Sequence, residues 1–321
     1  MSNDEVTDKR RWREWSRRRD TVVITGIGGR LGQALARRLH RSWEVIGVDR
    51  RPLDTLPPDI DFHKVDIRRR KTEDIFRQNR VDALIHLNIM HDPRKSPRET
   101  HDFNVRGTQK LLDLCQQHNV GKVIILSSAN VYGPAPTNNQ FLTEEAPLMG
   151  GQTFSEIRDL ISLDMYASSF FWRHPEIETV ILRPVHIVGD VGNAPSNYLR
   201  MKRIPTLVGY DPMIQLIHID DVVQAITRAL RPGIRGIFNV AGPGQLPLSE
   251  LIKALGKRSV PMIEPLAKPI LDMMWRARLT SFPTPELDHI KFVCMVDDSR
   301  ARRFLKYSPE RTMEETIRAL A

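Results

Sequence analysis

The chain has 321 residues, and 40% of them are hydrophobic, which is enough for a sizeable buried core. Its two cysteines, Cys115 and Cys294, show neither metal-ligand nor redox spacing, so we expect no metal site and a reducing, cytoplasmic environment. The sequence has no apolar run of about 18 residues and no apolar core within the first 20 residues. We therefore expect neither a membrane span nor a secretion signal.

The composition is basic, with a formal net charge of +9. Seven basic residues lie between Lys9 and Arg19, where acidic neighbours dilute them and Trp12 and Trp15 offer a small apolar face. We interpret residues 1–20 as a basic N-terminal tail, and the alternative is a weak peripheral membrane contact. Nucleic-acid binding would rest on net charge alone and is not expected.

The first strong pattern is the stretch from Thr21 to Gly32, TVVITGIGGRLG. Five β-favouring residues precede Gly26, Gly29 and Gly32, and an amphipathic run follows from Gln33 to His40, which predicts a strand, a tight turn and a helix. Glycines suit such a turn because a Cβ would keep the backbone away from a pyrophosphate, and a helix N-terminus favours negative charge. The stretch therefore predicts a dinucleotide cradle.

An acidic residue, Asp49, ends a second apolar strand from Trp43 to Val48 and lies 17 residues beyond Gly32. At this distance a carboxylate can accept hydrogen bonds from the adenosine ribose hydroxyls, which favours NAD as the cofactor. Arginines near the turn and near Asp49 can instead pair with a 2′-phosphate, which leaves NADP as the alternative. These arginines are Arg30, Arg50 and Arg51.

Strands and helices continue to alternate after Asp49. Asp66 and Ile67 follow a short strand from Phe62 to Val65, where they can meet the adenine edge or belong to a plain loop. The next elements are a strand from Val81 to Leu87, a polar connection from His91 to Thr100, a helix from about Phe103 to His118 and a strand from Val123 to Leu126. The alternation predicts an α/β fold with a Rossmann-type, doubly wound parallel sheet.

The carboxyl ends of these strands should line one crevice, because ligands bind beyond that edge of a doubly wound sheet. The segments expected there are Gly26, Asp49, His86 to Asn88, Ser127, Ser128 and the residues after Arg183.

From Arg183 onward the elements become shorter and less regular. A strand from Ile214 to Ile219, a helix from Asp220 to Leu230 with Asp220 and Asp221 as its caps, and a strand from Ile237 to Val240 are expected. We assign residues 21–189 to a dinucleotide-binding domain and residues 190–321 to a smaller C-terminal substrate-binding lobe, some of whose elements return to the main domain.

The segment from Leu266 to Phe282 has helical apolar spacing and three basic residues. Burial against the lobe is the expected role, and the alternatives are a lid over an apolar ligand and a monotopic membrane contact.

Taken together, the ordered motifs resemble the extended short-chain dehydrogenase/reductase family, in its NAD-dependent epimerase/dehydratase group. The resemblance covers roughly residues 20 to 320. Its motifs are TGIGGRLG, IHL at 85–87, NVRGTQKLLDLC at 104–115, LSSANVYG at 126–133, ILRPVHIVG at 181–189, IHIDDVV at 217–223, FNVAG at 238–242 and a closing DDSRARRFLKYSPERTMEETI.

The resemblance implies a cofactor site built from the glycine turn, the two acidic positions and polar residues on the following elements. The residues expected to contact NAD are Gly26, Gly28, Gly29, Arg30, Leu31, Gly32, Asp49, Arg50, Asp66, Ile67, Leu87, Asn88, Asn104 and Arg158.

In active members of the family, a Ser or Thr, a Tyr and a Lys act together on the substrate hydroxyl. Ser128 matches the serine, but Phe154 stands for the tyrosine and Arg158 for the lysine of the Tyr-x-x-x-Lys motif. Phenylalanine has no ionisable group, and the loss of a general acid/base typically costs about 10² to 10⁴ in rate. Arg158 can still hold a ribose hydroxyl or a phosphate but cannot shuttle protons.

Other residues are candidates for the missing acid/base. Tyr198 and Lys202 also form Tyr-x-x-x-Lys but follow the strand where the substrate lobe begins, and Tyr132 and Tyr166 are interpreted as packing residues. His186 occupies a position that resembles a substrate-contacting one in sugar-nucleotide epimerases, and imidazole exchanges protons near neutral pH. A structural histidine in the core is the alternative.

Two functions follow. The first is an NAD(P)-dependent oxidoreductase or epimerase that acts on a hydroxyl-bearing, sugar-like or lipid-like small molecule with Ser128, His186 and Arg158. The second is a catalytically inactive NAD(P)-binding regulatory or scaffold protein. Ile214 replaces an arginine that often pairs with the diphosphate in nucleotide-sugar enzymes, which weakens the case for such a substrate. The resemblance also implies a homodimer formed by the helices near 103–118 and 154–171.

Overall fold

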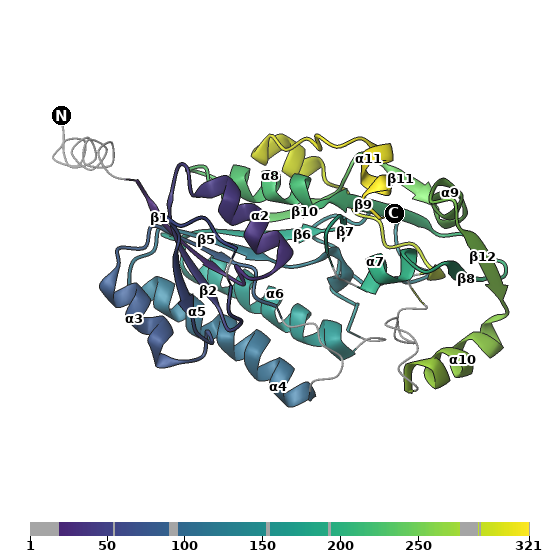
Figure 1. The fold of residues 1–321 in the computed structure, drawn as a ribbon, viewed down its shortest axis with the longest axis horizontal. Helices are drawn as coiled ribbons and strands as arrows, with labels where there is room; N and C mark the ends of the chain where they lie inside the picture. Colours follow the sequence, from purple (N-terminus) through teal and green to yellow (C-terminus); the bar gives the residue numbers. More distant parts are fainter. Residues whose placement is uncertain are drawn as a thin grey trace.

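A seven-stranded parallel sheet forms the centre of the computed structural model, which describes residues 19–53, 55–89, 96–151, 155–191, 194–276, 288 and 290–320 (Figure 1). The strand order is β10 (Gly236–Val240), β6 (Glu178–Pro184), β5 (Lys122–Leu126), β4 (Ala83–His86), β1 (Thr21–Thr25), β2 (Glu44–Asp49) and β3 (Asp61–Lys64). The predicted Rossmann-type sheet is confirmed.

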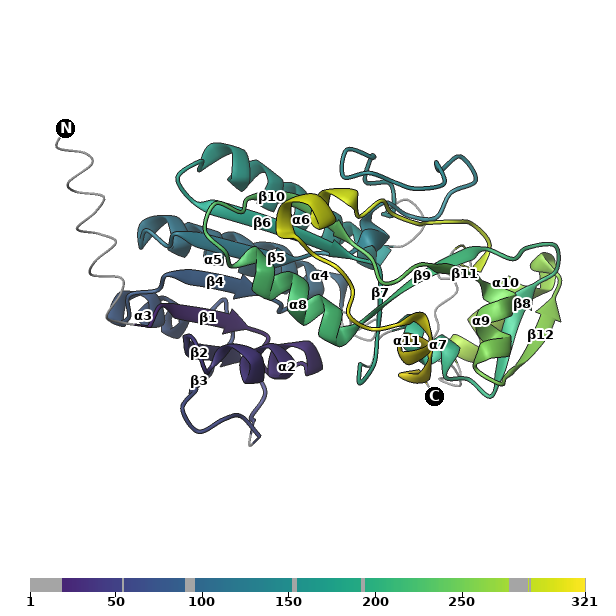
Figure 2. The same ribbon diagram turned by 90° about the horizontal axis from the view of Figure 1, so that it is seen from above.

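The two faces of the sheet bury two separate hydrophobic clusters, because successive residues of a strand point to opposite faces. Val22 and Ile24 of β1 belong to the cluster that includes residues of α2 (Arg30–Leu39) and α8 (Ile219–Ala229), and these two helices lie side by side in Figure 2. Val23 belongs to the cluster with α3 (Arg70–Gln78), α5 (Gly107–Gln117) and α6 (Ser155–Arg173). Burial on both faces explains why the strands occur in the sequence as continuous apolar runs.

Two helices differ from the sequence expectation. Helix α2 begins at Arg30, three residues before the predicted start, so the glycine turn is shorter. The helix predicted from Phe103 to His118 is a π-helical turn (Asp102–Arg106) followed by α5, and a short helix α4 (Pro97–His101) precedes it where a polar connection was expected. Asn104 lies buried on the π-helical turn, which ends where Gly107 packs closely on the buried Ile67.

The elements after residue 185 divide between the main sheet and a smaller lobe. The lobe contains a three-stranded sheet, in the order β11 (Gln245–Pro247), β9 (Met213–His218) and β7 (His186–Val188), and a two-stranded parallel ribbon of β12 (Arg258–Met262) and β8 (Arg203–Leu207). Helices α7 (Ala194–Leu199), α9 (Leu248–Ala254) and α10 (Glu264–Arg276) pack around these strands, whereas β10 and α8 return to the main sheet. Within the described residues, no helix is both long and apolar enough to cross a membrane.

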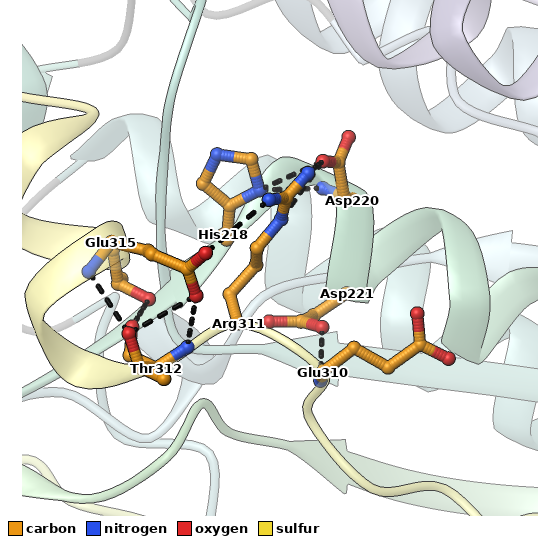
Figure 3. Close-up of polar contacts among 8 residues, drawn as sticks. His218, Asp220, Asp221, Glu310, Arg311, Thr312 and Glu315 are labelled. Carbon is orange, nitrogen blue, oxygen red and sulfur yellow. Dashed lines mark hydrogen bonds and ion pairs between the residues drawn. The ribbon is translucent and has the colours of Figure 1, made fainter.

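Residues 310–315 of the C-terminal segment contact the start of α8 through hydrogen bonds and an ion pair (Figure 3). Arg311 Nη2 lies 2.5 Å from Asp220 Oδ2, and the backbone N–H of Glu310 donates to Asp221 Oδ1 at 2.7 Å. Thr312 and Glu315 form a capping box that starts α11 (Met313–Arg318). The cap of α8 differs from the expectation, because His218 Nδ1 accepts the hydrogen bond from the Asp220 backbone and both aspartates lie inside the first turn.

Candidate cofactor and substrate site

The glycine turn between β1 and α2 has the geometry of a phosphate cradle. Gly26 has φ +77°, and a Cβ on it would lie 2.9 Å from the Asn88 backbone at the end of β4. A Cβ on Gly32 would lie 2.7 Å from the Ile27 Cα and overlap the Gly26 carbonyl oxygen, so only glycine lets α2 start this close to β1. The first turn of α2 carries neither a side-chain cap nor an acidic residue, which leaves its N–H groups available to an anion.

Asp49 is the last residue of β2, and its fully buried carboxylate contacts this turn. Its Oδ2 accepts a hydrogen bond from the Gly28 N–H at 3.0 Å, and its Oδ1 accepts one from the Arg51 N–H at 2.9 Å. The Arg51 side chain also covers the carboxylate, with Nε 3.2 Å from Oδ1 and Nη2 3.2 Å from Oδ2. A ribose hydroxyl can therefore reach Asp49 only if the exposed Arg51 side chain turns outward.

The second acidic residue, Asp66, is engaged by a neighbouring arginine. Arg68 donates from Nε and Nη2 to Asp66 at 3.0 and 2.7 Å, and from Nη1 to Asp102 at 2.6 Å. Burial raises the pKa of Asp66, but the hydrogen bonds from Arg68 outweigh it and hold that pKa below its usual value. The guanidinium groups of Arg68 and Arg50 both lie 5.4 Å from the centre of the Phe103 ring. An adenine amino group would have to share Asp66 with Arg68.

A buried donor without a partner lies at the end of β4. Among the described residues, no acceptor reaches the buried Asn88 Nδ2, although the neighbouring Leu87 N–H donates to the Thr25 carbonyl oxygen at 3.1 Å. Leaving a buried amide donor unpaired costs free energy, so the structure favours an acceptor from outside the chain at this point. Asn88 lies beside Gly26, which places this donor next to the glycine turn.

Ser128 follows β5 at the same edge of the sheet. Its Oγ accepts a hydrogen bond from the Asn130 N–H at 3.1 Å at the start of a 3₁₀ turn (Ala129–Val131), so the hydroxyl hydrogen is left to donate. Its neighbour Ser127 points the other way and donates to Asp164 Oδ2 of α6 at 2.6 Å.

A buried charged network, which was not predicted from the sequence, connects to Ser127 through Asp164. Arg183, at the end of β6, binds Asp164 through Nε–Oδ2 at 2.9 Å and Nη2–Oδ1 at 2.6 Å. Its Nη1 donates to the Tyr132 hydroxyl at 2.8 Å, and Tyr132 donates in turn to Asn239 Oδ1 at 2.7 Å. The available signal was an arginine inside the apolar strand ETVILRP, since a buried charge needs a partner.

The chain has five tyrosines, all in the described part, and each is engaged away from the glycine turn. Burial raises the pKa of Tyr132 to about 12. Tyr198 is buried and donates to the Pro205 carbonyl oxygen at 2.7 Å, and its sequence partner Lys202 is exposed. The others contact Asp113 (Tyr166), the Ala241 carbonyl oxygen (Tyr307) and the Phe292 ring (Tyr210).

His186 begins β7 and lines a pocket between the main sheet and the lobe. Burial lowers the pKa of His186 to about 4, so the imidazole is neutral at physiological pH. No charged side chain belongs to the pocket, whose other lining residues are Ala129, Asn130, Val185, Met213, Ile214, Gln215, Phe292 and Cys294. Burial raises the pKa of Cys294 to about 12, so its thiol is also uncharged.

Of the two residues at the Tyr-x-x-x-Lys positions, the structure describes only one. Phe154 lies outside the described residues, and Arg158 is an exposed residue of α6 whose Nε donates to the Gly151 carbonyl oxygen at 3.0 Å. The contact of Arg158 with a cofactor therefore stays a prediction.

An ion pair joins the cradle to the loop after β7. Arg30, the first residue of α2, places Nη1 3.0 Å from Asp190 Oδ2, and both side chains are exposed. Arg200 holds the same loop by donating to the carbonyl oxygens of Val191 and Gly189 at 2.7 and 2.6 Å. Arg30 was predicted as a partner for a 2′-phosphate, and its contact with Asp190 could not be read from the sequence.

Comparison with known proteins agrees with the observed fold. The model of the NAD dependent epimerase/dehydratase family matches residues 22–241. An uncharacterized protein of Mycobacterium tuberculosis is 28% identical over 310 residues, which cover 92% of this chain and 82% of the relative. UDP-glucose 4-epimerase 2 of Oryza sativa subsp. japonica is 29% identical over 240 residues, which cover 68% of this chain and 54% of the relative.

Two solved structures illustrate the likeness of the fold. The UDP-glucuronic acid 4-epimerase of Bacillus cereus, in complex with UDP-glucuronic acid and NAD, has a TM-score of 0.73 at 18% identity, covering 93% of this chain and 97% of its own. The dTDP-glucose 4,6-dehydratase of Bacillus anthracis, in complex with NAD, has a TM-score of 0.70 at 18% identity, covering 94% and 95%.

Proposed function

The chain belongs to the NAD-dependent epimerase/dehydratase family, and we propose that it binds NAD in the crevice at the carboxyl ends of its parallel strands. The observation that carries this proposal is the buried Asn88 Nδ2, which lacks an acceptor beside the glycine turn. The other residues fit the same group, with the uncapped first turn of α2 for the pyrophosphate and Asp49 for the adenosine ribose. NADP is the second choice, because Arg51 lies on Asp49 and can meet a 2′-phosphate.

We further propose that the protein is an oxidoreductase or epimerase with a non-standard acid/base. NAD supplies a hydride acceptor when bound. Ser128 would donate a hydrogen bond to the oxygen of the substrate hydroxyl, and the neutral His186 would accept the proton that this hydroxyl loses as its carbon gives up a hydride. A base whose pKa is lowered to about 4 is a weak proton acceptor, so we expect slow turnover.

The uncharged lining of the small pocket beside His186 favours a neutral, hydroxyl-bearing group, as in a sugar-like or lipid-like substrate. It contains no charged side chain, and Ile214 contributes an apolar surface where a guanidinium would be needed to pair with a diphosphate. The relatives and structures named above include enzymes that act on nucleotide sugars. Nucleotide sugars are therefore the substrate class against which a neutral substrate should be compared.

The second candidate is an NAD-binding protein without turnover that acts through a partner. The observation in its favour is that every tyrosine is engaged away from the glycine turn while phenylalanine stands at position 154. Without a proton carrier, cofactor binding would persist while hydride transfer stops.

Calorimetric titration of the full chain with NAD, NADH, NADP and NADPH tests cofactor binding. We expect NAD or NADH to bind, and Asn88→Ala to weaken the binding about tenfold because one buried hydrogen bond is lost. Asn79→Ala is the matched control, since Asn79 Nδ2 donates to the Ile75 carbonyl oxygen at the end of α3. No binding of any of the four, with no nucleotide retained from purification, would contradict the proposal.

Restoring the missing pair separates the two candidates. Phe154→Tyr combined with Arg158→Lys should raise NADH formation on a panel of polyols, free sugars and aliphatic alcohols if the pocket still binds a substrate. His186→Gln should lower the residual rate of the natural chain if His186 is the proton acceptor. NAD binding without turnover in any of these forms would favour the second candidate.

We also propose a homodimer through α5 and α6, as the family resemblance implies. Met165 and Trp172 of α6 are exposed by 61% and 76% and lie two turns apart on one side of the helix. Trp172→Glu should convert a dimer to a monomer in light scattering coupled to size exclusion, whereas a monomeric natural chain would exclude this interface.

A further inference from the structure

The far end of the lobe carries an apolar surface that the described chain does not cover. Eleven large apolar side chains are exposed in the described residues, and six of them lie within the short stretches 203–210 and 258–273. These six are Val208, Tyr210, Val260, Ile263, Leu266 and Met273. Figure 2 shows β8, β12 and α10, which contain or adjoin these residues, at the end of the molecule away from the seven-stranded sheet.

The members of this surface are neighbours in space. Strands β8 and β12 run parallel and end at one edge, where the Val208 N–H donates to the Met262 carbonyl oxygen at 3.0 Å. The chain then turns into α10 at Ile263, whose carbonyl oxygen accepts the Leu266 N–H at 3.0 Å. Met273 lies seven residues beyond Leu266, on the same side of the helix. We call Val208, Ile263, Leu266 and Met273 the apolar tip.

Helix α10 is therefore apolar on two sides. Ala267 and Leu271 are buried against the core of the lobe, whereas Leu266 and Met273 are 52% and 65% exposed. An exposed apolar cluster of this kind is typical of a surface that contacts a membrane or a partner.

The same ribbon carries unpaired positive charge. Arg203 and Arg258 stand directly opposite each other at the start of β8 and β12, and Lys202 directly precedes Arg203. All three are exposed, and within the described residues none has an ion-pair partner. Like charges facing each other across strands destabilise a sheet, so an external anion would relieve the repulsion.

Two acidic residues near the ribbon, Asp211 and Glu264, are already engaged. Asp211 accepts hydrogen bonds from the Ser249 N–H and hydroxyl at 2.8 and 2.6 Å, and Glu264 binds Lys291 Nζ at 2.7 Å. Along β12, Arg258 and Val260 are both exposed, so positive charge and apolar side chains follow one edge strand toward the tip.

We propose that the apolar tip and the two arginines form a docking surface for an anionic lipid membrane. The aliphatic side chains enter the boundary between headgroups and acyl chains, and Arg203 and Arg258 meet lipid phosphates. A nucleic acid would match the arginines but leave the aliphatic residues exposed. A second copy of this chain would bring four like charges together, which opposes self-association.

Cosedimentation of the full chain with vesicles tests the proposal. We expect binding to vesicles of phosphatidylcholine mixed with phosphatidylglycerol, weaker binding to phosphatidylcholine alone, and a decrease with added salt. Ile263→Asn combined with Leu266→Asn should reduce the partition coefficient at least about tenfold on both vesicles. Arg203→Ser combined with Arg258→Ser should reduce it about 25-fold on the anionic vesicles alone, because each of the two charges contributes roughly a factor of five.

The matched control is Phe304→Asn. Phe304 is 53% exposed, almost the same as Leu266 at 52%, but lies on a π-helical turn (Ala301–Leu305) outside the lobe ribbon. Its variant should bind vesicles like the natural chain, and circular dichroism should show the same fold in every variant.

Three outcomes would overturn the proposal. The first is no vesicle binding by the natural chain. The second is unchanged binding by the Ile263 and Leu266 double variant, which would assign the contact to another region such as the basic segment 1–20. The third is displacement by a short DNA duplex that binds equally well to that double variant, which would identify the ribbon as a nucleic-acid surface.

Discussion

The glycine cradle and the pocket beside His186 are formed by different parts of the chain. In the cradle, backbone atoms and glycines set the shape, because a Cβ on Gly26 or Gly32 would collide with neighbouring backbone. In the pocket, side chains such as His186 and Ile214 set the chemistry. A side chain can be exchanged without moving the backbone, so a chain can keep its cofactor site while its substrate chemistry changes. The predictions below test how independent the two regions are.

The largest effect is expected at Arg183, a buried residue at the end of β6. Arg183→Met leaves the buried Asp164 carboxylate without its partner and should lower the free energy of unfolding by about 3–5 kcal/mol in urea denaturation. Arg77→Met is the control, because the exposed Arg77–Asp74 pair is worth less than about 1 kcal/mol. A loss at Arg183 no larger than at Arg77 would mean that water replaces the buried pair.

A smaller loss is expected at Gly32, inside the cradle. Gly32→Ala forces a Cβ to within 2.7 Å of the Ile27 Cα, so the start of α2 has to shift. We expect a loss of about 2–3 kcal/mol in unfolding free energy and a fall in NAD affinity by titration calorimetry. Gly121→Ala should change neither, since the nearest atom to its Cβ, the Asp82 carbonyl oxygen, is 3.7 Å away. Full NAD affinity in Gly32→Ala would separate the cradle geometry from cofactor binding.

The pH dependence of stability should report on His86, which is buried between Thr25 and Thr108. Burial lowers the pKa of His86 to about 4 from 6.5, so the unfolded chain binds more protons between these values. Stability is then complete above pH 6.5 and decreases as the pH falls toward 4, by about 2 kcal/mol between pH 7 and pH 5.

The measurement is urea unfolding at both pH values for the natural chain and His86→Gln. The variant should lose this part of the pH dependence and keep the part that comes from His186, whose pKa is lowered in the same way. Equal slopes in the two proteins would contradict the burial of a neutral imidazole at position 86.

The cradle and the main sheet could be predicted because their signals are local. Alternation of apolar strands and amphipathic helices fixed the order of elements, and the glycine spacing located the turn. The distance from Gly32 identified Asp49 in the sequence. The direction of the Arg51 side chain could not be predicted, although Arg51 is only two residues from Asp49. Which way an exposed arginine turns depends on the folded surroundings and not on the sequence pattern.

Contacts between distant segments could not be predicted. Arg183 and Asp164 are 19 residues apart and meet only when α6 packs on the sheet. The ribbon of β8 and β12 was missed because RIPTL and RSVPM each contain a proline and β12 is mostly exposed, so neither shows the alternation of a half-buried strand. The expectation that the segment from Leu266 is buried holds for Ala267 and Leu271, whereas Leu266 and Met273 are exposed and residues 277–282 lie outside the described part.

The smallest effect is expected at the ion pair that joins the two regions, Arg30 with Asp190. Both side chains are exposed, by 61% and 77%, so Asp190→Asn should change the free energy of unfolding by less than about 0.5 kcal/mol. The same variant should tighten NAD binding by a factor of about two to five at low salt, because Arg30 is released toward the pyrophosphate. Arg30→Ala should weaken it by a similar factor. If Asp190→Asn leaves NAD affinity unchanged while Arg30→Ala lowers it, the aspartate does not compete with the cofactor, and the pocket side of the crevice has no influence on the cradle.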